Sequence, residues 1–345
     1  MFEASLGQPQ HHENLTIFPI LAGKNRDLPY LLMAEALAVG VLTIGEKNGG
    51  QVPVLLATNA GKQAILVLDG EQLIGAKQNR MTNRSILLPP KSITEIPVSC
   101  MEQGRWHFET DHFAPAPQHA PSKVRRRARE TEAEASYMAE LRGPGARSSH
   151  RDLAAAQGEV WNEIRAFGEK LGSTSETGAL DSIYESRRTQ MEGWTQAFPL
   201  VENQVGLVAF QGETPLATDA VGSPSLYAKV HQRLLTGYVL DAMEGWDPHH
   251  PTPRAAAPEA ELVLEALGAA ERVPSHSVGS GEYRILRGRV LGGELIHDAQ
   301  LVHVSAFPAD EGWSFGSNPG STGPRQPAGP RGTPIARPSR RRRGL

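Results

Sequence analysis

Between Leu15 and Phe108 the chain repeats one pattern, in which a short apolar run is followed by a turn signal and then by another apolar run. The runs are LTIFPIL, VLTIGE, VPVLLAT, QAILVLD, SILLPP and TEIPVSC, and turns such as NAG at 59–61 lie between them. Short strands at this even spacing are typical of an antiparallel sandwich or barrel. The run AILVL is apolar at every position, which indicates a strand that is covered on both faces.

Together with this segment, the rest of the chain predicts an α+β protein with an antiparallel sandwich- or barrel-like core. Residues 15–108 form the first half of that core, and residues 109–122, rich in proline, histidine and alanine, predict a linker. Residues 123–200 predict a helical insert, because their apolar residues recur at helical spacing. Residues 201–313 predict an α+β second half of the core. Residues 314–345, dominated by glycine, proline and arginine, predict a disordered tail.

Some elements are predicted in more detail. Tyr30–Val39 contains no glycine or proline and predicts a short helix that Gly40 ends. Arg125–Leu141 is rich in charged residues and predicts a helix that is largely exposed to solvent. Gly281–Val290 and Glu294–Phe307 predict two strands near the end of the core.

The charge of the chain is unevenly distributed. The formal net charge is −3, but seven of the 35 basic residues are arginines after Ser314, where no carboxylate occurs. The rest of the chain therefore has 28 basic and 38 acidic residues, a net charge of about −10. An acidic body repels phosphate backbones, which argues against a nucleic-acid-binding protein. Only the tail, with Arg340–Arg343, has the charge to contact RNA, DNA or an acidic partner, and such tails are more often simply solvated.

The sequence contains no sign of a membrane or secretory segment. No apolar stretch approaches the roughly 20 residues that a membrane span requires. The N-terminal residues lack the basic start and the apolar run of a secretory signal. Cys100 is the single cysteine, which excludes an internal disulfide framework and fits a reducing compartment. We therefore expect a cytoplasmic protein.

The first of two dense polar runs is GAKQNR, residues 75–80. Its two amides and two cations offer many hydrogen-bond donors for a phosphate, a ribose or a carboxylate. Lys77, Gln78, Asn79 and Arg80 are therefore candidate ligand-binding residues. The run lacks the GxxxxGK(S/T) spacing of a Walker loop. The alternative is a polar turn whose amides pair with the backbone of neighbouring strands, and both interpretations stay open.

The second polar run is SCMEQGRWHF, residues 99–108. Glu102, Gln103 and Arg105 follow the strand TEIPVSC, where a loop is expected. Glu102 is the candidate catalytic residue, because a positioned carboxylate orients water or a ribose hydroxyl. Gln103 and Arg105 are candidate ligand-binding residues. The alternative is that Glu102 and Arg105 pair only with each other, which contributes little on an exposed surface.

Two other residues of this run have simpler predicted roles. Cys100 shares one face of a period-two strand with Ile96 and Val98, so its thiol is expected to point into the core. This position argues against a nucleophile formed by Cys100 and His107. Trp106 is expected to cover the core rather than to stack on a base.

Metal binding is poorly supported by the sequence. The twelve histidines are scattered, and neither an HExxH motif nor a cysteine pair occurs. His297, Asp298 and His303 lie on predicted strands and would converge only if the tertiary structure brought them together. We therefore predict no metal site, and the sequence identifies no cofactor.

The stretches LTIFPIL, DGEQLIGAKQNR and PVSCMEQGRW resemble the ARG and rhodanese-phosphatase-associated protein domain, a family of largely uncharacterised bacterial and archaeal proteins. The later stretch QVGLVAFQGETPLATDAVGSPSLYAKVHQRLLTGYVLDA and the strand AQLVHVSAF are similar to the second half of that family. The resemblance implies a role near ADP-ribose or NAD-derived nucleotides, and association with ADP-ribose-processing or phosphatase-like proteins. It supplies no catalytic mechanism.

Two functions are therefore compatible with the sequence. In the first, the protein binds or processes a nucleotide ligand, and Lys77, Asn79, Arg80 and Arg105 hold phosphate or ribose oxygens. In the second, it is a non-catalytic interaction module whose polar runs are structural, and the helical insert or the arginine tail binds a protein partner. The sequence leaves open whether the protein is an enzyme. The two functions differ in whether the two polar runs meet at one pocket.

Overall fold

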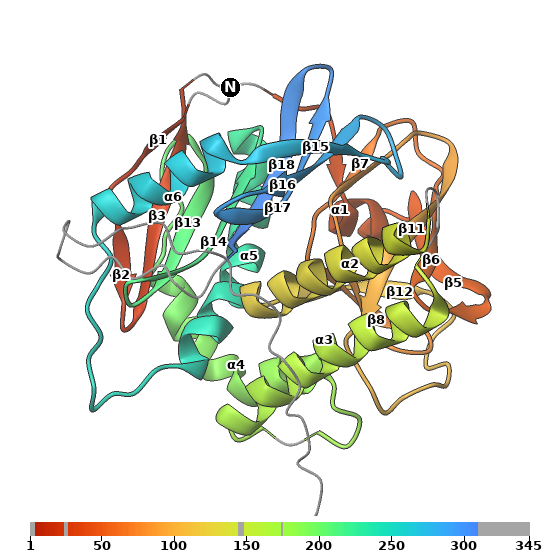
Figure 1. The fold of residues 1–345 in the computed structure, drawn as a ribbon, viewed down its shortest axis with the longest axis horizontal. Coiled ribbons are helices and arrows are strands. Elements are labelled where there is room, and N and C mark those ends of the chain that lie inside the picture. The colour runs from red at the N-terminus through yellow and green to blue at the C-terminus, as the bar shows by residue number, and fades with distance from the viewer. Residues whose placement is uncertain (1–3, 24–26, 144–147, 174, 310–345) are drawn as a thin grey trace, which may run out of the picture. The chain divides into compact units, whose positions relative to one another are not determined.

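The computed structural model describes residues 4–23, 27–143, 148–173 and 175–309. Within these residues it is an α+β protein with six helices and largely antiparallel sheets, which confirms the predicted fold class (Figure 1). The tail predicted at 314–345 lies outside the described residues. None of the helices among the described residues is both long and apolar enough to cross a membrane.

The largest sheet joins strands from both ends of the chain. In it β3 pairs with β13, and the strand order is β1-β3-β13-β14-β18-β17-β16-β15, with β2 also paired to β3. Residues 15–22 therefore belong with the second half of the chain and not with the strands that follow them. The strands are β1 (Ala4–Leu6), β2 (Gln10–His12), β3 (Leu15–Ala22), β13 (Gln204–Gln211), β14 (Thr214–Val221), β15 (Glu271–Ser275), β16 (Glu282–Arg287), β17 (Val290–His297) and β18 (Gln300–Pro308).

Two smaller sheets form the other side of the molecule. One has the order β12-β8-β9-β11-β6-β5, and the other has the order β10-β7-β4, in which β4 and β7 are parallel. Apolar side chains such as Leu55, Ile96 and Phe113 pack between them. The strands are β4 (Leu31–Leu32), β5 (Leu42–Gln51), β6 (Val54–Asn59), β7 (Ile65–Val67), β8 (Glu71–Gly75), β9 (Arg80–Thr82), β10 (Ile86–Leu88), β11 (Ser92–Cys100) and β12 (Phe113–His119).

Helices cover the sheets and connect them. Figure 1 shows α2 and α3 side by side across the front, with α4 below them. Their apolar faces, together with that of α5, pack in one cluster that includes Phe167, Trp194 and Tyr238. The helices are α1 (Met33–Ala38), α2 (Ser122–Arg142), α3 (His150–Lys170), α4 (Leu180–Gln196), α5 (Pro224–Glu244) and α6 (Ala257–Ala269).

Part of the predicted linker at 109–122 is a strand. β12 pairs with β8 at the edge of the six-stranded sheet. Proline lacks a backbone N–H and is tolerated in a strand at such an edge, because one side of the strand needs no partner. Phe113 and Ala116 are buried while Pro117 is exposed, so the proline-rich sequence forms a strand, with a shift in register between Pro115 and His119.

Two other predicted elements have different bounds. The helix predicted at Tyr30–Val39 starts only at Met33, because the preceding residues form β4. The single strand predicted at Glu294–Phe307 is divided in two: it covers the end of β17, a turn at Asp298 and Ala299, and β18 as far as Phe307. Asp298 and Ala299 both have positive φ, at 50° and 58°, and two such residues in succession fit a tight hairpin turn.

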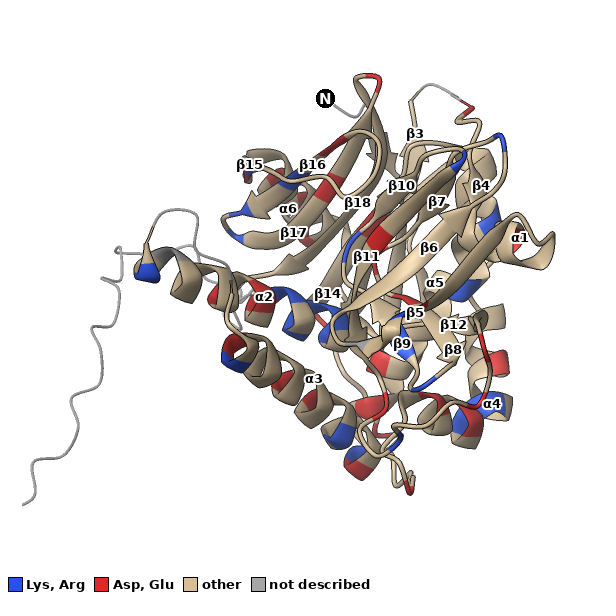
Figure 2. Ribbon diagram, turned by 90° about the vertical axis from the view of Figure 1, so that its right-hand side faces the viewer, with Lys and Arg blue, Asp and Glu red and all other residues tan. Residues whose placement is uncertain are grey.

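The prediction that Arg125–Leu141 is largely exposed is wrong for the first half of this segment. The segment lies in α2, which packs between α3 and β14 (Figure 2), and the side chains of Arg125 and Arg129 are buried. Arg125 donates two hydrogen bonds of 2.8 Å to the carboxylate of Asp219, and one of 2.8 Å to Ser305. The sequence did not indicate this burial because the acidic partners lie in distant segments.

The same ion cluster extends into the first half of the chain. Arg129 donates to Asp69 at 2.7 Å, and Asp69 also lies 3.5 Å from Nε of Arg125. Tyr238 on α5 donates to Asp219. The Arg125 cluster, defined as Asp69, Arg125, Arg129, Asp219 and Tyr238, thus connects the β7–β8 turn to α2, β14 and α5.

Candidate functional site

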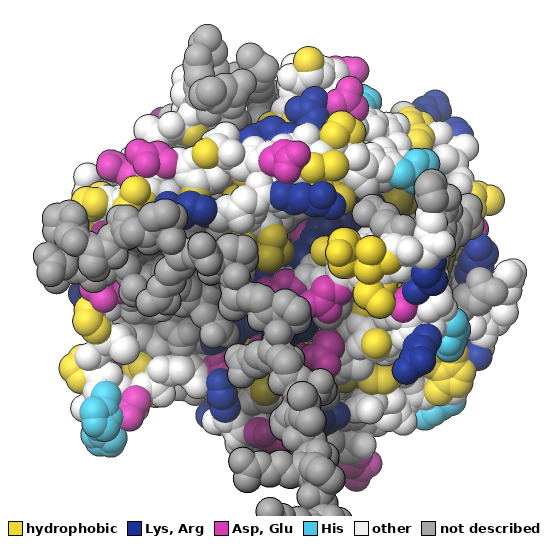
Figure 3. Space-filling view, in the orientation of Figure 1, with side chains coloured by type: hydrophobic (Ala, Val, Ile, Leu, Met, Phe, Trp, Pro, Cys, Tyr) yellow, Lys and Arg dark blue, Asp and Glu magenta, His cyan; other side chains and the backbone are white. Residues whose placement is uncertain are grey.

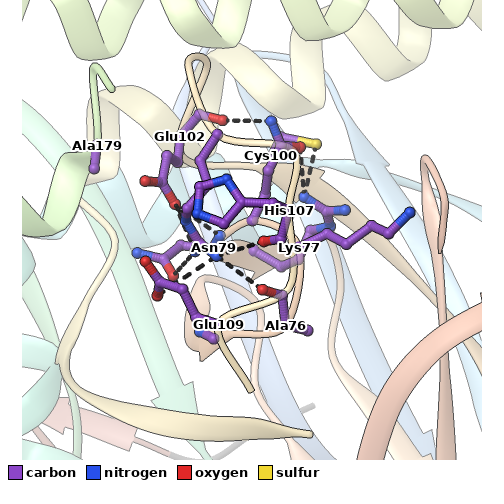
Figure 4. A network of polar contacts seen from close by, with 12 residues as sticks. Ala76, Lys77, Asn79, Cys100, Glu102, His107, Glu109 and Ala179 are labelled. Carbon is purple, nitrogen blue, oxygen red and sulfur yellow. Dashed lines mark hydrogen bonds and ion pairs between the residues drawn. The ribbon is translucent and has the colours of Figure 1, made fainter. Parts of the chain in front are cut away.

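The two polar runs meet in space. GAKQNR forms the turn between β8 and β9, and the second run begins at the end of β11. Because β9 and β11 are antiparallel with Arg80 opposite Cys100, the residues that follow β11 lie beside the turn. Figure 4 shows the side chains of the two runs pointing toward one another.

Arg105 is at the centre of this arrangement. Its Nε donates to Oε2 of Glu102 at 2.8 Å, and its Nη2 donates to Oδ1 of Asn79 at 3.0 Å. Its Nη1 donates to the carbonyl oxygen of Ala76 at 2.8 Å. The Arg105 side chain is only 3% exposed. We call Ala76, Asn79, Glu102 and Arg105 the Arg105 cluster, and its donors and acceptors satisfy one another.

The predicted catalytic residue Glu102 is held in this cluster. Its Oε2 also accepts a hydrogen bond of 3.3 Å from the backbone N–H of Asn79. Burial raises the pKa of Glu102, but hydrogen bonds from Arg105 and Thr177 lower it more, so the pKa lies below its ordinary value. The carboxylate is therefore ionised and fully engaged. Its catalytic role stays a prediction.

Gln78 and Arg80 form a second layer next to the Arg105 cluster. Gln78 donates to the carbonyl oxygen of Glu102 at 2.8 Å and accepts from Arg80 at 2.9 Å. Arg80 is fully buried, and its Nη2 lies 3.3 Å from Oε1 of Glu46. Its Nη1 also approaches Sγ of Cys100 at 3.1 Å. The buried side chain of Arg80 thus supports the end of β11.

Lys77 and Gln103 are the more accessible of the predicted ligand-binding residues. The Lys77 ammonium lies 5.1 Å from the ring centroids of both Trp106 and Phe108. Trp106 is 49% exposed, so the prediction that it covers the core is wrong. The guanidinium of Arg80 also lies 5.7 Å from the centroid of the Trp106 ring, in the range of a cation–π contact. Gln103 is exposed and its Oε1 accepts from Arg165 of α3.

Cys100 is buried, as its strand parity predicts. Burial raises the pKa of its thiol to about 11, which leaves it protonated and a poor nucleophile at neutral pH. Its backbone is bound by the side chain of Gln157 on α3. Gln157 accepts from the N–H of Cys100 at 2.7 Å and donates to its carbonyl oxygen at 2.9 Å. One glutamine therefore takes the place of a neighbouring strand and fixes α3 to the sheet.

A cavity of about 390 Å³ opens beside this contact, between β11 and the helices α2 and α3. Pockets that hold small molecules typically measure about 300–1,000 Å³. Gln78, Cys100 and Trp106 bring both polar runs to its wall. Apolar side chains, including those of Val98 and Leu153, make up much of the rest.

Two residues of the cavity wall each have a buried polar atom without a partner. Oδ1 of Asn83 and Nε1 of Trp161 make no hydrogen bond to any residue that the structure describes. A buried acceptor or donor without a partner costs about 1–3 kcal/mol. One acceptor and one donor in the same cavity could be satisfied together by a ligand with complementary groups. Neither residue was among the predicted ones, because both lie outside the two polar runs.

The histidines considered for metal binding have separate partners. Nδ1 of His297 lies 2.8 Å from the hydroxyl of Tyr30, whereas Nδ1 of His303 lies 2.6 Å from Oγ of Ser85. His303 is buried and its Nε2 is 3.5 Å from Asp219. Among the described residues, no group of three or more His, Cys, Asp or Glu side chains is arranged to hold a metal ion.

The fold and the cavity define a mixed α+β protein in which a sheet and two helices enclose a space of small-molecule size. Residues 3–307 match the ARG and Rhodanese-Phosphatase-superfamily-associated Protein domain, and the chain belongs to this family. The resemblance found in the two polar runs is thereby confirmed. Neither the comparison with curated proteins nor the comparison with solved structures found a match.

Proposed function

We propose that the cavity between β11 and helices α2 and α3 binds a nucleotide-like small molecule such as ADP-ribose, NAD or AMP. The observation that carries the proposal is the pair of unpartnered buried atoms, Oδ1 of Asn83 and Nε1 of Trp161, on two residues that line a largely apolar cavity. An adenine base has a flat apolar surface with an amino donor and ring-nitrogen acceptors on its edge. The base would bury its surface, donate to Asn83 and accept from Trp161.

The charges near the cavity suit the phosphates of such a ligand. The exposed Trp106 ring lines the cavity, and the Lys77 ammonium lies over that ring. No hydrogen bond or ion pair links the Lys77 ammonium to another described residue, so it is available for a phosphate oxygen. Arg84 pairs with Glu132, which also lines the cavity. Of the predicted ligand-binding residues, Lys77 and Gln78 would thus be near the ligand, while Asn79, Arg80 and Arg105 support the wall from behind.

We propose binding and not hydrolysis. Glu102 is not part of the cavity wall, and its carboxylate is engaged by Arg105 and by the N–H of Asn79. A general base has to reach the attacking water. Glu132 is the carboxylate on the wall, and it is occupied by Arg84.

Titration calorimetry with ADP-ribose, NAD and AMP tests this proposal. We expect heat from at least one of them, and about tenfold weaker binding by Trp161→Phe, which keeps a ring but removes the N–H donor. Trp246→Phe is the matched control, because Trp246 lies outside this cavity. If folded protein gave no heat of binding with any of the three nucleotides, the proposal would be refuted. Equal binding by wild type and Trp161→Phe would place the ligand elsewhere.

A second candidate function is an interaction module, and one observation favours it. Tyr137, Met138 and Leu141 near the end of α2 are 60%, 49% and 64% exposed. Figure 3 shows hydrophobic side chains exposed over α2 with charged ones around them. We propose a phosphatase-like or ADP-ribose-processing protein as the partner, in line with the name of the family. Replacing the three residues by serine should abolish co-purification of such a co-expressed partner, and unchanged co-purification would refute this function.

A further inference from the structure

A second cavity, of about 330 Å³, lies between the β2–β3 turn and the loop that follows α5. Its wall is mostly polar and includes Asn14, Trp246 and Arg254. The first cavity shares no lining residue with it. The second cavity is thus an independent place to look for a ligand.

Asn14, on the wall of this cavity, has a buried side-chain acceptor without a partner. Asn14 is 5% exposed, and its Nδ2 donates to the carbonyl oxygen of Ala242 at 2.9 Å. Because a carbonyl only accepts, this contact fixes which end of the amide is nitrogen. The other end, Oδ1, has no donor among the residues that the structure describes. A ligand with an N–H or O–H group would satisfy it.

The guanidinium of Arg254 is a free cation on the same wall. Arg254 is exposed and makes no hydrogen bond or ion pair to another described residue. The two carboxylates of the cavity are occupied. Glu13 accepts from Nε1 of Trp246 at 3.1 Å, and Asp247 lies 2.7 Å from Nδ1 of His250. Arg254 is therefore the group available to a carboxylate of a ligand.

The charges of the cavity indicate what kind of molecule it suits. The carboxylates of Glu13 and Asp247 would repel an anion that has no positive group. The guanidinium of Arg254 would repel a simple cation. A molecule that carries both charges avoids both repulsions. The indole of Trp246 is on the same wall, and an aromatic ring attracts an ammonium.

We propose that this second cavity binds a small zwitterion of the α-amino-acid class. The carboxylate of the ligand pairs with Arg254, and its ammonium donates to Oδ1 of Asn14 and lies against Trp246. The nearby His11 is consistent with this arrangement: burial and the charge of Arg254 lower its pKa, so at neutral pH it adds no second positive charge. The proposal does not depend on the nucleotide proposal for the first cavity.

The experiment is a titration of the intact chain with the individual protein amino acids at millimolar concentration, followed by calorimetry and thermal unfolding. We expect at least one amino acid to bind, and its N-acetyl and carboxamide derivatives to bind at least about tenfold more weakly. Arg254→Gln should weaken binding at least about tenfold as well. Arg287→Gln is the matched control, because Arg287 is also an exposed arginine and lies outside both cavities.

Three results would overturn the proposal. The first is the absence of binding by any amino acid to protein that unfolds cooperatively. The second is equal binding of an amino acid and its N-acetyl derivative, since the ammonium would then play no part. The third is equal loss in Arg254→Gln and Arg287→Gln. Because Arg254 is exposed, its replacement is not expected to prevent folding.

Discussion

Arg105 and Arg125 are both buried and both bind carboxylates, yet they join very different parts of the chain. Arg105 binds Glu102, Asn79 and Ala76, all within 29 positions of it. Arg125 binds Asp219, 94 positions away, and Ser305, 180 positions away. The Arg105 cluster thus joins two neighbouring loops, whereas the Arg125 cluster connects the β7–β8 turn to α2, β14 and α5. The difference shows that a dense polar run in a loop can serve local structure, while two arginines within a charged helix connect distant segments of the chain.

The largest effect is expected from replacing Arg125. Arg125→Met leaves the fully buried carboxylate of Asp219 without its cation, which should cost about 3–5 kcal/mol of unfolding free energy. Chemical denaturation measures this change. Arg126→Met is the control one position along the same helix, because Arg126 makes a partly exposed pair with Glu130 worth at most about 1 kcal/mol. Equal losses in the two variants would contradict a central role for the Arg125 cluster.

A smaller and more local effect is expected at Arg105. Arg105→Met leaves Glu102 and Asn79 without their donor, which should cost about 3 kcal/mol or less. Amide hydrogen exchange should accelerate mainly in residues 76–109 and leave the nine-stranded sheet protected. Arg165→Met, which removes an exposed contact to Gln103, serves as the control. Acceleration throughout the nine-stranded sheet would show that the Arg105 cluster is not local.

The smallest of the three effects depends on pH. His119 lies near the Arg125 cluster, and burial, together with the charge of Arg125, lowers its pKa from 6.5 to about 3. In the unfolded chain His119 becomes protonated near pH 6.5, whereas in the folded protein it stays neutral until about pH 3. Stability from this group is therefore complete above pH 6.5 and is lost as the pH falls. Acidification from pH 7 to pH 5 should therefore lower the unfolding free energy by about 2 kcal/mol through this group.

Denaturation of wild type and His119→Gln across this pH range measures the contribution. The variant should lack the loss of about 2 kcal/mol on acidification. His249→Gln, at an exposed position, should behave as wild type. Parallel curves for wild type and His119→Gln would show that His119 is not kept neutral by its surroundings.

The sequence predicted the fold class because strand-length apolar runs and their turns are local signals. It also singled out the runs GAKQNR and MEQGR, which lie together in space. It did not predict β12, because proline masks an edge strand, nor the burial of Arg125, because Asp219 is 94 positions distant. The sequence also did not single out Asn83 and Trp161, because the two residues are far apart in the chain. Only their tertiary positions turn an ordinary amide and an ordinary indole into unpartnered groups of one cavity.

The pairing of β3 with β13 has a consequence for the order of events during synthesis. β3 leaves the ribosome about 190 residues before β13, since the two strands begin at Leu15 and Gln204. At elongation rates of about 5–20 residues per second this delay is about 10–40 s. Through that time the apolar strand LTIFPIL lacks its principal neighbour and is an aggregation hazard. The nascent chain is therefore expected to need a chaperone on its first strands until the second half has been translated.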